Sequence, residues 1–216
     1  MTMTLNLHLS IDLAINLLAA GTYFGAASLL WKNMDLMHAA SKIKSLGFQL
    51  WLLAMLLHGG GLLPLLSSGA GLDLAFFKSA SLIALIISLL LFINCLRQSL
   101  EVLAFFILPV TALLVLLAYF STTQHIISGA VHMGVQAHII LSLLAYSLLS
   151  FGALQSLVLA WQDRQLRRNP SHFFMNRLPS LEAMESFLLT LITSGFILLT
   201  LGIFAGFHIY LSLIHI

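Results

Sequence analysis

The chain has 216 residues, of which 60% are hydrophobic and only 7% charged, and its formal net charge is +2. Soluble domains usually carry about 25% charged residues, so this composition excludes an ordinary soluble fold and predicts a polytopic membrane protein. The small net charge gives no indication of a nucleic-acid partner, and the single cysteine, Cys95, excludes a disulfide within the chain and any CxxC motif.

Six apolar runs are long enough to cross a membrane. A bilayer core about 30 Å thick is crossed by roughly 20 apolar residues in a helix. The predicted spans lie near residues 8–31, 45–66, 74–95, 101–120, 136–161 and 184–207. The predicted fold is therefore all-α: a polytopic integral membrane helix bundle of about six transmembrane helices, forming a single transmembrane domain over residues 1–216.

The basic residues predict which side each loop faces. Eight of the nine Lys and Arg residues fall in alternate loops, and only Lys78 lies near the opposite ends of the spans. Since loops rich in Lys and Arg remain in the cytoplasm, loops 32–44, 96–100 and 162–183 are expected to be cytoplasmic and both termini outside. The start "MTMTLNLHLS" lacks a positive region, and the first apolar run is too long for a signal-peptide core, so it is expected to be a retained span.

Nine histidines are unusual in so apolar a chain. The predicted orientation puts four of them at or near the outer face: His125, His132, His138 and His208. His58 lies inside the second span, roughly 12 Å from its outer end at 1.5 Å per residue. An ionisable group there is a functional hypothesis, because burying it without a partner is costly. A hydrogen bond between helices explains His58 as well as a ligand role does.

A polar stripe begins at His138. His138, Ser142 and Tyr146 are spaced four residues apart, which predicts one helix face directed into the bundle. An interfacial anchor explains the same spacing, because polar and aromatic residues collect at membrane boundaries. Haem needs only one or two axial imidazoles in an apolar slot, whereas HExxH, GxSxG and P-loop motifs are absent. The residues alone permit haem binding without requiring it.

Several stretches are similar to a known family. "HIILSLLAYSLLSFGALQSLVLAWQDRQLRR" (138–168) and "LPSLEAMESFLLTLITSGFILLTLGIFAG" (178–206) resemble the YpjD/HemX-like branch of the cytochrome c assembly (CcsA-type) inner membrane proteins. "LLAMLLHGGG" (52–61), "FFKSASLIALIISLLLFI" (76–93) and "EVLAFFILPVTALLVLLA" (101–118) fit in the same order. The resemblance rests above all on the His-x₃-Ser-x₃-Tyr helix and the Leu-Pro-x-Leu-Glu start of the next span.

The resemblance implies a haem-handling protein of the bacterial inner membrane, linked to cytochrome c assembly or to tetrapyrrole regulation. His138 and His58 match histidines of the family, and they are the candidate ligands of the iron of a b-type, non-covalently bound haem. His132 and His208 are the alternatives at the outer face. The two lead residues differ in predicted depth by roughly 9 Å at 1.5 Å per residue, so separate outer and deep sites are expected.

The sequence departs from the family in two places. Loop 121–135 contains no tryptophan, unlike the tryptophan-rich outer motif of the haem-handling synthetases. An accessory protein without catalytic residues is therefore expected, with the lipid bilayer, haem and cytochrome c assembly components as partners. Similar family members continue into further spans, which the tail "FHIYLSLIHI" does not match, so a chain truncated at its C-terminus is expected.

Two other functions fit parts of the sequence. Asp12, near the outer end of the first span, and His58 would be the relay groups of a small-solute or proton-coupled transporter, although no inverted repeat is evident. The basic loop 162–183 would tether a partner protein in a membrane scaffold, or lie on anionic lipid headgroups.

Overall fold

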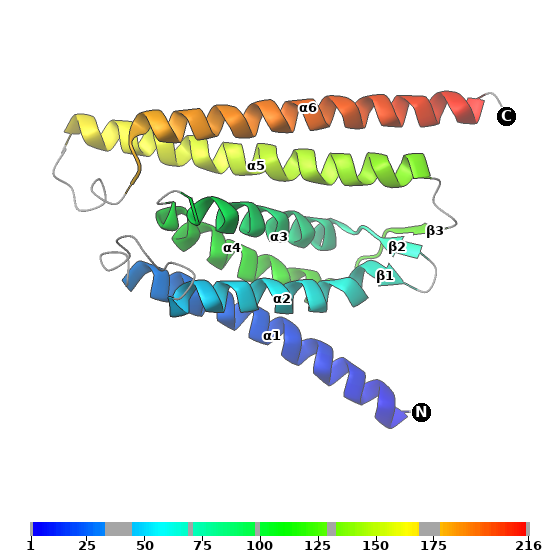
Figure 1. The fold of residues 1–216 in the computed structure, drawn as a ribbon. Coiled ribbons are helices and arrows are strands. Elements are labelled where there is room, and N and C mark those ends of the chain that lie inside the picture. Colours follow the sequence, from blue (N-terminus) through cyan, green and yellow to red (C-terminus); the bar gives the residue numbers. More distant parts are fainter. Residues whose placement is uncertain are drawn as a thin grey trace. The chain divides into compact units, whose positions relative to one another are not determined.

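Six long helices form from the apolar runs (Figure 1). The structure is a computed structural model, and it describes residues 2–32, 45–68, 71–97, 100–128, 133–168 and 178–214. Within these ranges, all six helices are long and apolar enough to cross a membrane. Their bounds are α1 Thr2–Lys32, α2 Leu46–Leu66, α3 Phe76–Cys95, α4 Glu101–Phe120, α5 Met133–Arg168 and α6 Leu181–Ile214. The predicted all-α, multi-pass bundle is confirmed.

The ends of three helices agree closely with the predicted spans. The helices α2, α3 and α4 begin within two residues of the prediction. The helices α5 and α6 extend beyond their apolar runs, and the 36 residues of α5 would measure about 54 Å at 1.5 Å per residue. A hydropathy pattern marks what the bilayer covers, whereas backbone hydrogen bonding continues into polar sequence.

Three short strands, which the sequence patterns did not predict, lie at the ends of helices. They are β1 Ser67–Ser68, β2 Gly71–Asp73 and β3 Ile126–Ser128, in the sheet order β1-β2-β3. β1 and β2 are antiparallel, with Ser67 opposite Leu72. Strands of two or three residues are too short for a period-2 pattern to identify them. We call the part of the molecule around these strands the sheet end.

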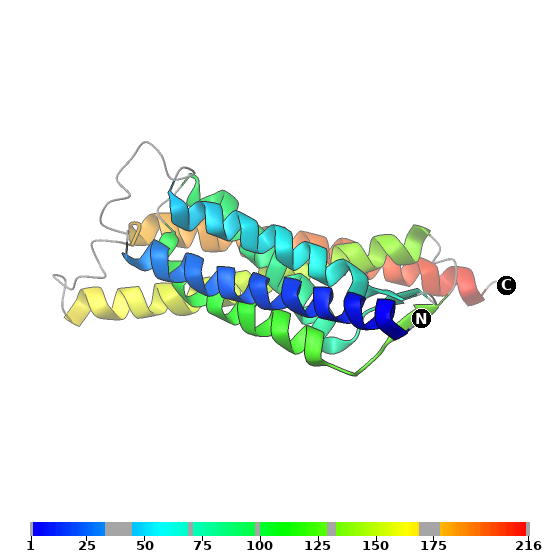
Figure 2. The ribbon, with the colours of Figure 1, turned by 90° about the horizontal axis from the view of Figure 1, so that it is seen from below.

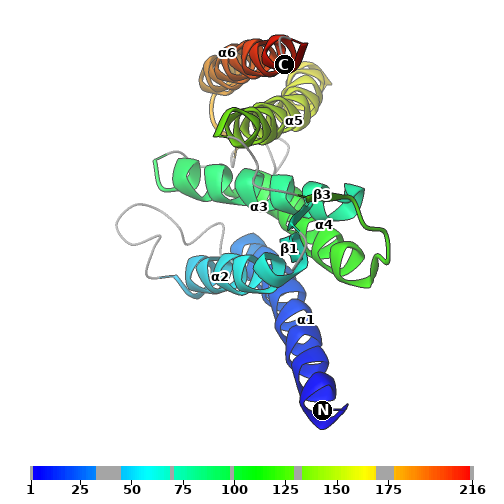
Figure 3. The same ribbon diagram turned by 90° about the vertical axis from the view of Figure 1, so that its right-hand side faces the viewer.

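The chain divides into two compact units, Met1–Ile127 and Ser128–Ile216, and each is described by itself. In unit 1, α1 packs against α2 and α4, and α3 packs against α4 and α2 (Figure 2). In unit 2, α5 and α6 lie side by side (Figure 3). That all 216 residues form a single domain stays a prediction.

Each unit has its own aromatic contacts. In unit 1, the rings of Phe48, Trp51 and Phe92 are 5.2–5.8 Å apart between centroids. In unit 2, Phe151 of α5 meets Phe187 of α6 at 5.6 Å. A Cβ at Gly195 of α6 would lie 2.9 Å from the Leu149 side chain, so glycine allows α5 and α6 to approach closely there.

Candidate functional site

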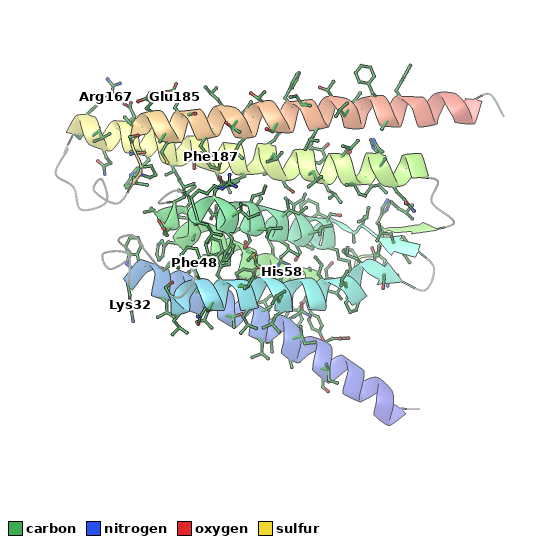
Figure 4. The ribbon with its side chains drawn as sticks, in the orientation of Figure 1. Lys32, Phe48, His58, Arg167, Glu185 and Phe187 are labelled. Atoms are coloured by element: carbon green, nitrogen blue, oxygen red, sulfur yellow. The ribbon has the colours of Figure 1, made fainter. Side chains whose placement is uncertain are left out.

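His58 is held in the interior of unit 1 by two hydroxyl groups. It lies on α2, is 1% exposed, and is directed toward the neighbouring helices of its unit in Figure 4. Its Nδ1 lies 3.2 Å from the Tyr23 hydroxyl of α1, and its Nε2 lies 2.8 Å from Ser81 Oγ of α3. The Tyr23 and His58 rings meet edge to face. Both ring nitrogens are therefore engaged inside unit 1.

A second polar pair continues this set. Trp51 Nε1 donates to Ser88 Oγ at 2.8 Å, and Ser88 is also a polar neighbour of the Tyr23 hydroxyl. We call these five buried residues the His58 network: Tyr23, Trp51, His58, Ser81 and Ser88. Since a buried polar group is costly unless it is hydrogen-bonded, their mutual pairing explains how an apolar bundle accommodates them.

The His58 network sets a condition on any ligand role for His58. A histidine that binds a metal must present the lone pair of a ring nitrogen. Tyr23 occupies one nitrogen and Ser81 the other, so iron at His58 would require one of these hydrogen bonds to open. In this structure His58 makes interhelical hydrogen bonds, and its role as an iron ligand stays a prediction.

One turn further along α2, Gly61 leaves room for a polar side chain of α1. A Cβ at Gly61 would lie 2.9 Å from Asn16 Oδ1, closer than packed atoms permit. Asn16 is buried, and its Nδ2 donates to the Asp12 backbone oxygen at 2.8 Å. Among the described residues, no hydrogen bond joins Asp12 to His58, so the transporter relay gains no support from a direct contact.

His138, near the start of α5, is bonded differently. It is half-buried, and its Nδ1 lies 2.8 Å from the carbonyl oxygen of Gly202 on α6. A carbonyl oxygen can only accept, so Nδ1 carries the proton, and in the neutral ring Nε2 keeps its lone pair. Metal-ligating histidines usually donate their other N–H in this way, which fixes the tautomer and the ring orientation. His138 therefore has the tautomer that an axial ligand needs.

One glycine of α6, Gly206, lies against the His138 ring, and a second, Gly202, supplies the carbonyl oxygen that the ring bonds. A Cβ at Gly206 would lie 3.0 Å from His138 Cε1 and 3.1 Å from its Nδ1. At Gly202 a Cβ would lie 3.5 Å from Ser142 Oγ, which is an ordinary contact. We call His138, Gly202 and Gly206 the His138 seat.

The predicted polar stripe on α5 is only partly present. His138 and Ser142 face α6, but Tyr146 is 54% exposed. The prediction of one common face is therefore wrong for Tyr146. At about 100° per residue, eight residues turn the helix about 80° away from the starting face, so a spacing of four drifts out of line within two steps.

The remaining candidate histidines are only partly described. His132 lies outside the described residues. His208 lies within α6, but its side chain is outside what the structure describes. His125 is exposed at the sheet end, in unit 1.

A buried ion pair stabilises the sheet end. The Asp73 carboxylate accepts from Lys78 Nζ, from the backbone N–H of His125 at 2.9 Å and from that of Ala75 at 3.1 Å. Burial raises the pKa of the Asp73 carboxyl, but these hydrogen bonds and the Lys78 charge outweigh that effect and hold the pKa below its ordinary value. Asp73 thus ties the start of α3 to the segment that follows α4.

No group of three or more His, Cys, Asp or Glu residues comes together as a metal site within the described ranges. Haem iron, which needs only one or two imidazoles, is the metal that a single one of these histidines could bind. The His138 seat fits such a ligand, because Nδ1 is oriented by a carbonyl oxygen and Nε2 keeps its lone pair in the neutral ring. The closed His58 network does not fit without rearrangement.

Sequence patterns missed the partners of both histidines. Tyr23 and Ser81 lie 35 and 23 residues from His58, and no pattern within a helix connects them. The spacing of Gly202 and Gly206 did carry a signal, because small residues four apart favour close helix contact. It indicates a contact face, although not which side chain lies on it.

Comparison with known proteins gave one match. Residues 46–210 match a family described as "Cytochrome C assembly protein". No curated protein and no solved structure matches the chain. The matched region contains α2 to α5 and most of α6, including His58 and the His138 seat, whereas α1 lies before it.

Proposed function

Because the chain belongs to the cytochrome c assembly protein family, we propose that it binds a b-type haem non-covalently and serves cytochrome c assembly as an accessory protein rather than as an enzyme. Within the family, we assign it to the YpjD/HemX-like branch. It is a multi-pass membrane protein with a role in cytochrome c biogenesis. The binding of haem and the identity of its histidine ligands are proposed in addition to this role.

The His138 seat is the observation that carries the proposal. Its imidazole is oriented by the Gly202 carbonyl through Nδ1, and Gly206 leaves the space that the ring needs. The bound haem would supply a redox-active iron, and His138 is the residue that would bind it. This chain's part would be to hold Nε2 of His138 in place and to provide an apolar surface on α5 and α6.

Three further histidines are candidate ligands in this proposal: His58, His132 and His208. His58 becomes a ligand only when its contact with Tyr23 or Ser81 opens. His132 and His208 are alternatives at the same predicted outer face; His132 directly precedes α5 in the sequence, and His208 lies within α6. We propose a bacterial inner-membrane location with the N-terminus outside, supported by the distribution of basic residues.

The first prediction is a loss of haem on substitution of His138. Purified protein in detergent should show a Soret band on addition of haem. His138→Ala should lower the haem affinity by at least about 10-fold, since altering even the outer-shell partner of a metal ligand costs 10- to 100-fold. His58→Ala should leave the band position unchanged. Visible spectroscopy during haem titration measures both effects.

The matched control is His125→Ala, which removes an exposed imidazole from unit 1 and should bind haem like the wild type. Single His132→Ala and His208→Ala variants test the alternatives. An unchanged Soret band in the His58→Ala/His138→Ala double variant would reject haem binding by the two lead histidines.

A further inference from the structure

The basic end of α5 is helical rather than part of a loop. Three arginines of the predicted loop 162–183 lie instead on α5, which continues to Arg168. Residues 139–161 carry no charged side chain and no histidine, and they would measure about 35 Å at 1.5 Å per residue. That length slightly exceeds the bilayer core of about 30 Å, which places Trp161 at the membrane boundary and the arginines after it at the level of the lipid headgroups.

One exposed face of α5 changes from apolar to aromatic to basic along this end. Four residues at spacings of four, three and four share the face: Leu157, Trp161, Arg164 and Arg168. We call them the α5 basic face. Leu157 is 68% exposed and Trp161 37% exposed, and both arginines are exposed. The side chains therefore follow the order of acyl chain, boundary and headgroup in a bilayer.

The two arginines of this face keep their charges available. Among the described residues, neither Arg164 nor Arg168 forms an ion pair. The neighbouring Arg167, in the last turn of α5 (Figure 4), pairs instead with Asp163 at 3.0 Å. At about 100° per residue, Asp163 and Arg167 lie on an adjacent face of the helix. The acidic residue thus neutralises the arginine beside the α5 basic face and not the two on it.

We propose that the α5 basic face binds the headgroup of an anionic phospholipid. A guanidinium group matches phosphate oxygens with two parallel N–H donors. Arg164 and Arg168 are about 6 Å apart along the helix axis, so two such groups reach one headgroup. Trp161 would lie at the boundary, as interfacial tryptophans do, and Leu157 would contact an acyl chain.

The apolar half of the face is what favours a lipid over an acidic protein partner. A soluble acidic protein would contact the arginines but would gain nothing from an exposed leucine and tryptophan deeper along the same helix. A phospholipid uses all three kinds of side chain at once, because its phosphate and its acyl chains are joined. In the proposed orientation, the lipid belongs to the inner leaflet, whose anionic headgroups attract basic residues near the membrane.

The test measures quenching of Trp161 fluorescence by brominated lipids, using the full chain without haem. Vesicles contain equal amounts of phosphatidylglycerol and phosphatidylcholine, with bromine on one lipid or on the other, so that the surface charge is the same in both. The Trp161 signal is the difference between the wild type and Trp161→Phe. Brominated phosphatidylglycerol should quench Trp161 with a relative affinity at least about 5-fold higher, the factor expected for one basic residue at an anionic surface.

The arginine variants show whether the α5 basic face is the site. Arg164→Gln and Arg168→Gln should each lower the preference for phosphatidylglycerol, and the double variant should abolish it. Arg167→Gln is the matched control, because it removes the same charge from the adjacent face and should retain the preference. Equal losses in Arg164→Gln and Arg167→Gln would overturn the proposal, since diffuse charge would then explain the binding. Equal quenching by the two lipids in the wild type would also overturn it, and would leave a partner protein as the occupant.

Two further measurements complete the test. If Trp161→Phe fails to fold, native mass spectrometry compares the phosphatidylglycerol retained by the wild type and by Arg164→Gln/Arg168→Gln, and equal retention overturns the proposal. Excess inorganic phosphate at constant ionic strength should not relieve the quenching. Relief would show a site for free phosphate and would reject the lipid. Because haem is absent throughout, the outcome is independent of the proposed haem-binding function.

Discussion

At the scale of single residues, the two lead histidines are bonded in different ways. His58 has hydroxyl partners on both nitrogens, whereas Nδ1 of His138 donates to a backbone carbonyl. The sequence could show that each is a histidine within an apolar helix, and the resemblance could pair both with a family. It could not show their partners, because Gly202 lies 64 residues from His138 and spacing within one helix carries no information about another.

A second prediction concerns the glycine beneath His138. Gly206→Ala should lower the haem affinity by about 10-fold or more, comparable to the loss of an outer-shell partner of a metal ligand. The added Cβ would lie 3.0 Å from the ring, so the imidazole must shift and its bond to Gly202 weaken. Haem titration followed at the Soret band measures the change.

Gly152→Ala is the matched control on the facing helix. Its Cβ would meet side chains of α6 at 3.6–3.8 Å, which are ordinary contacts. It should bind haem like the wild type. Equal losses in Gly152→Ala and Gly206→Ala would mean that general packing of α5 on α6, rather than the His138 seat, controls haem binding.

At the scale of elements, helix positions were predictable and their connections were not. The length of an apolar run is tied to the thickness of the bilayer, so α2, α3 and α4 end close to where the hydropathy does. No comparable external length fixes the positions of the short strands at the sheet end. Its geometry depends on Asp73, which pairs with Lys78 and accepts from the backbone of His125, 52 residues away.

A third prediction concerns this buried ion pair. Asp73→Asn should lower the free energy of unfolding by about 3–5 kcal/mol, because it leaves Lys78 buried without its carboxylate. Asp163→Asn removes the carboxylate of an exposed pair with Arg167 and should cost no more than about 0.5 kcal/mol. Thermal unfolding in detergent compares the two variants. Equal destabilisation would contradict the role of burial.

The lowered pKa of Asp73 also predicts a pH dependence. Its carboxyl has a lower pKa in the folded chain than the ordinary value of about 3.9 expected when unfolded. The resulting stabilisation is complete above that ordinary value, and it is lost as the pH falls through the folded pKa. The difference in Tm between the wild type and Asp73→Asn should therefore be constant near neutral pH and narrow below about pH 4.

At the scale of the whole molecule, Lys78 is the one basic residue that departs from the predicted charge pattern, and the structure shows what it binds. Lys78 was the one basic residue on the predicted outer side, and it is buried against Asp73. Its charge is therefore compensated locally. The positions of the Lys and Arg residues in the sequence were enough to predict a topology. They could not show that Lys78, the one basic residue on the other side, is paired with a carboxylate.

The final prediction tests this orientation with single cysteines. Gln124 follows α4 and Arg97 follows α3, so they lie beyond opposite ends of α4, and both are exposed. Gln124→Cys should react with a membrane-impermeant maleimide in intact cells whose outer membrane has been opened, because both termini and the sheet end are proposed to face outward. Arg97→Cys should react only after the inner membrane is permeabilised, since its loop is proposed to be cytoplasmic. The parent chain, whose Cys95 is buried, supplies the unlabelled control. The reverse labelling pattern would turn the whole bundle over and place the His138 seat on the cytoplasmic side.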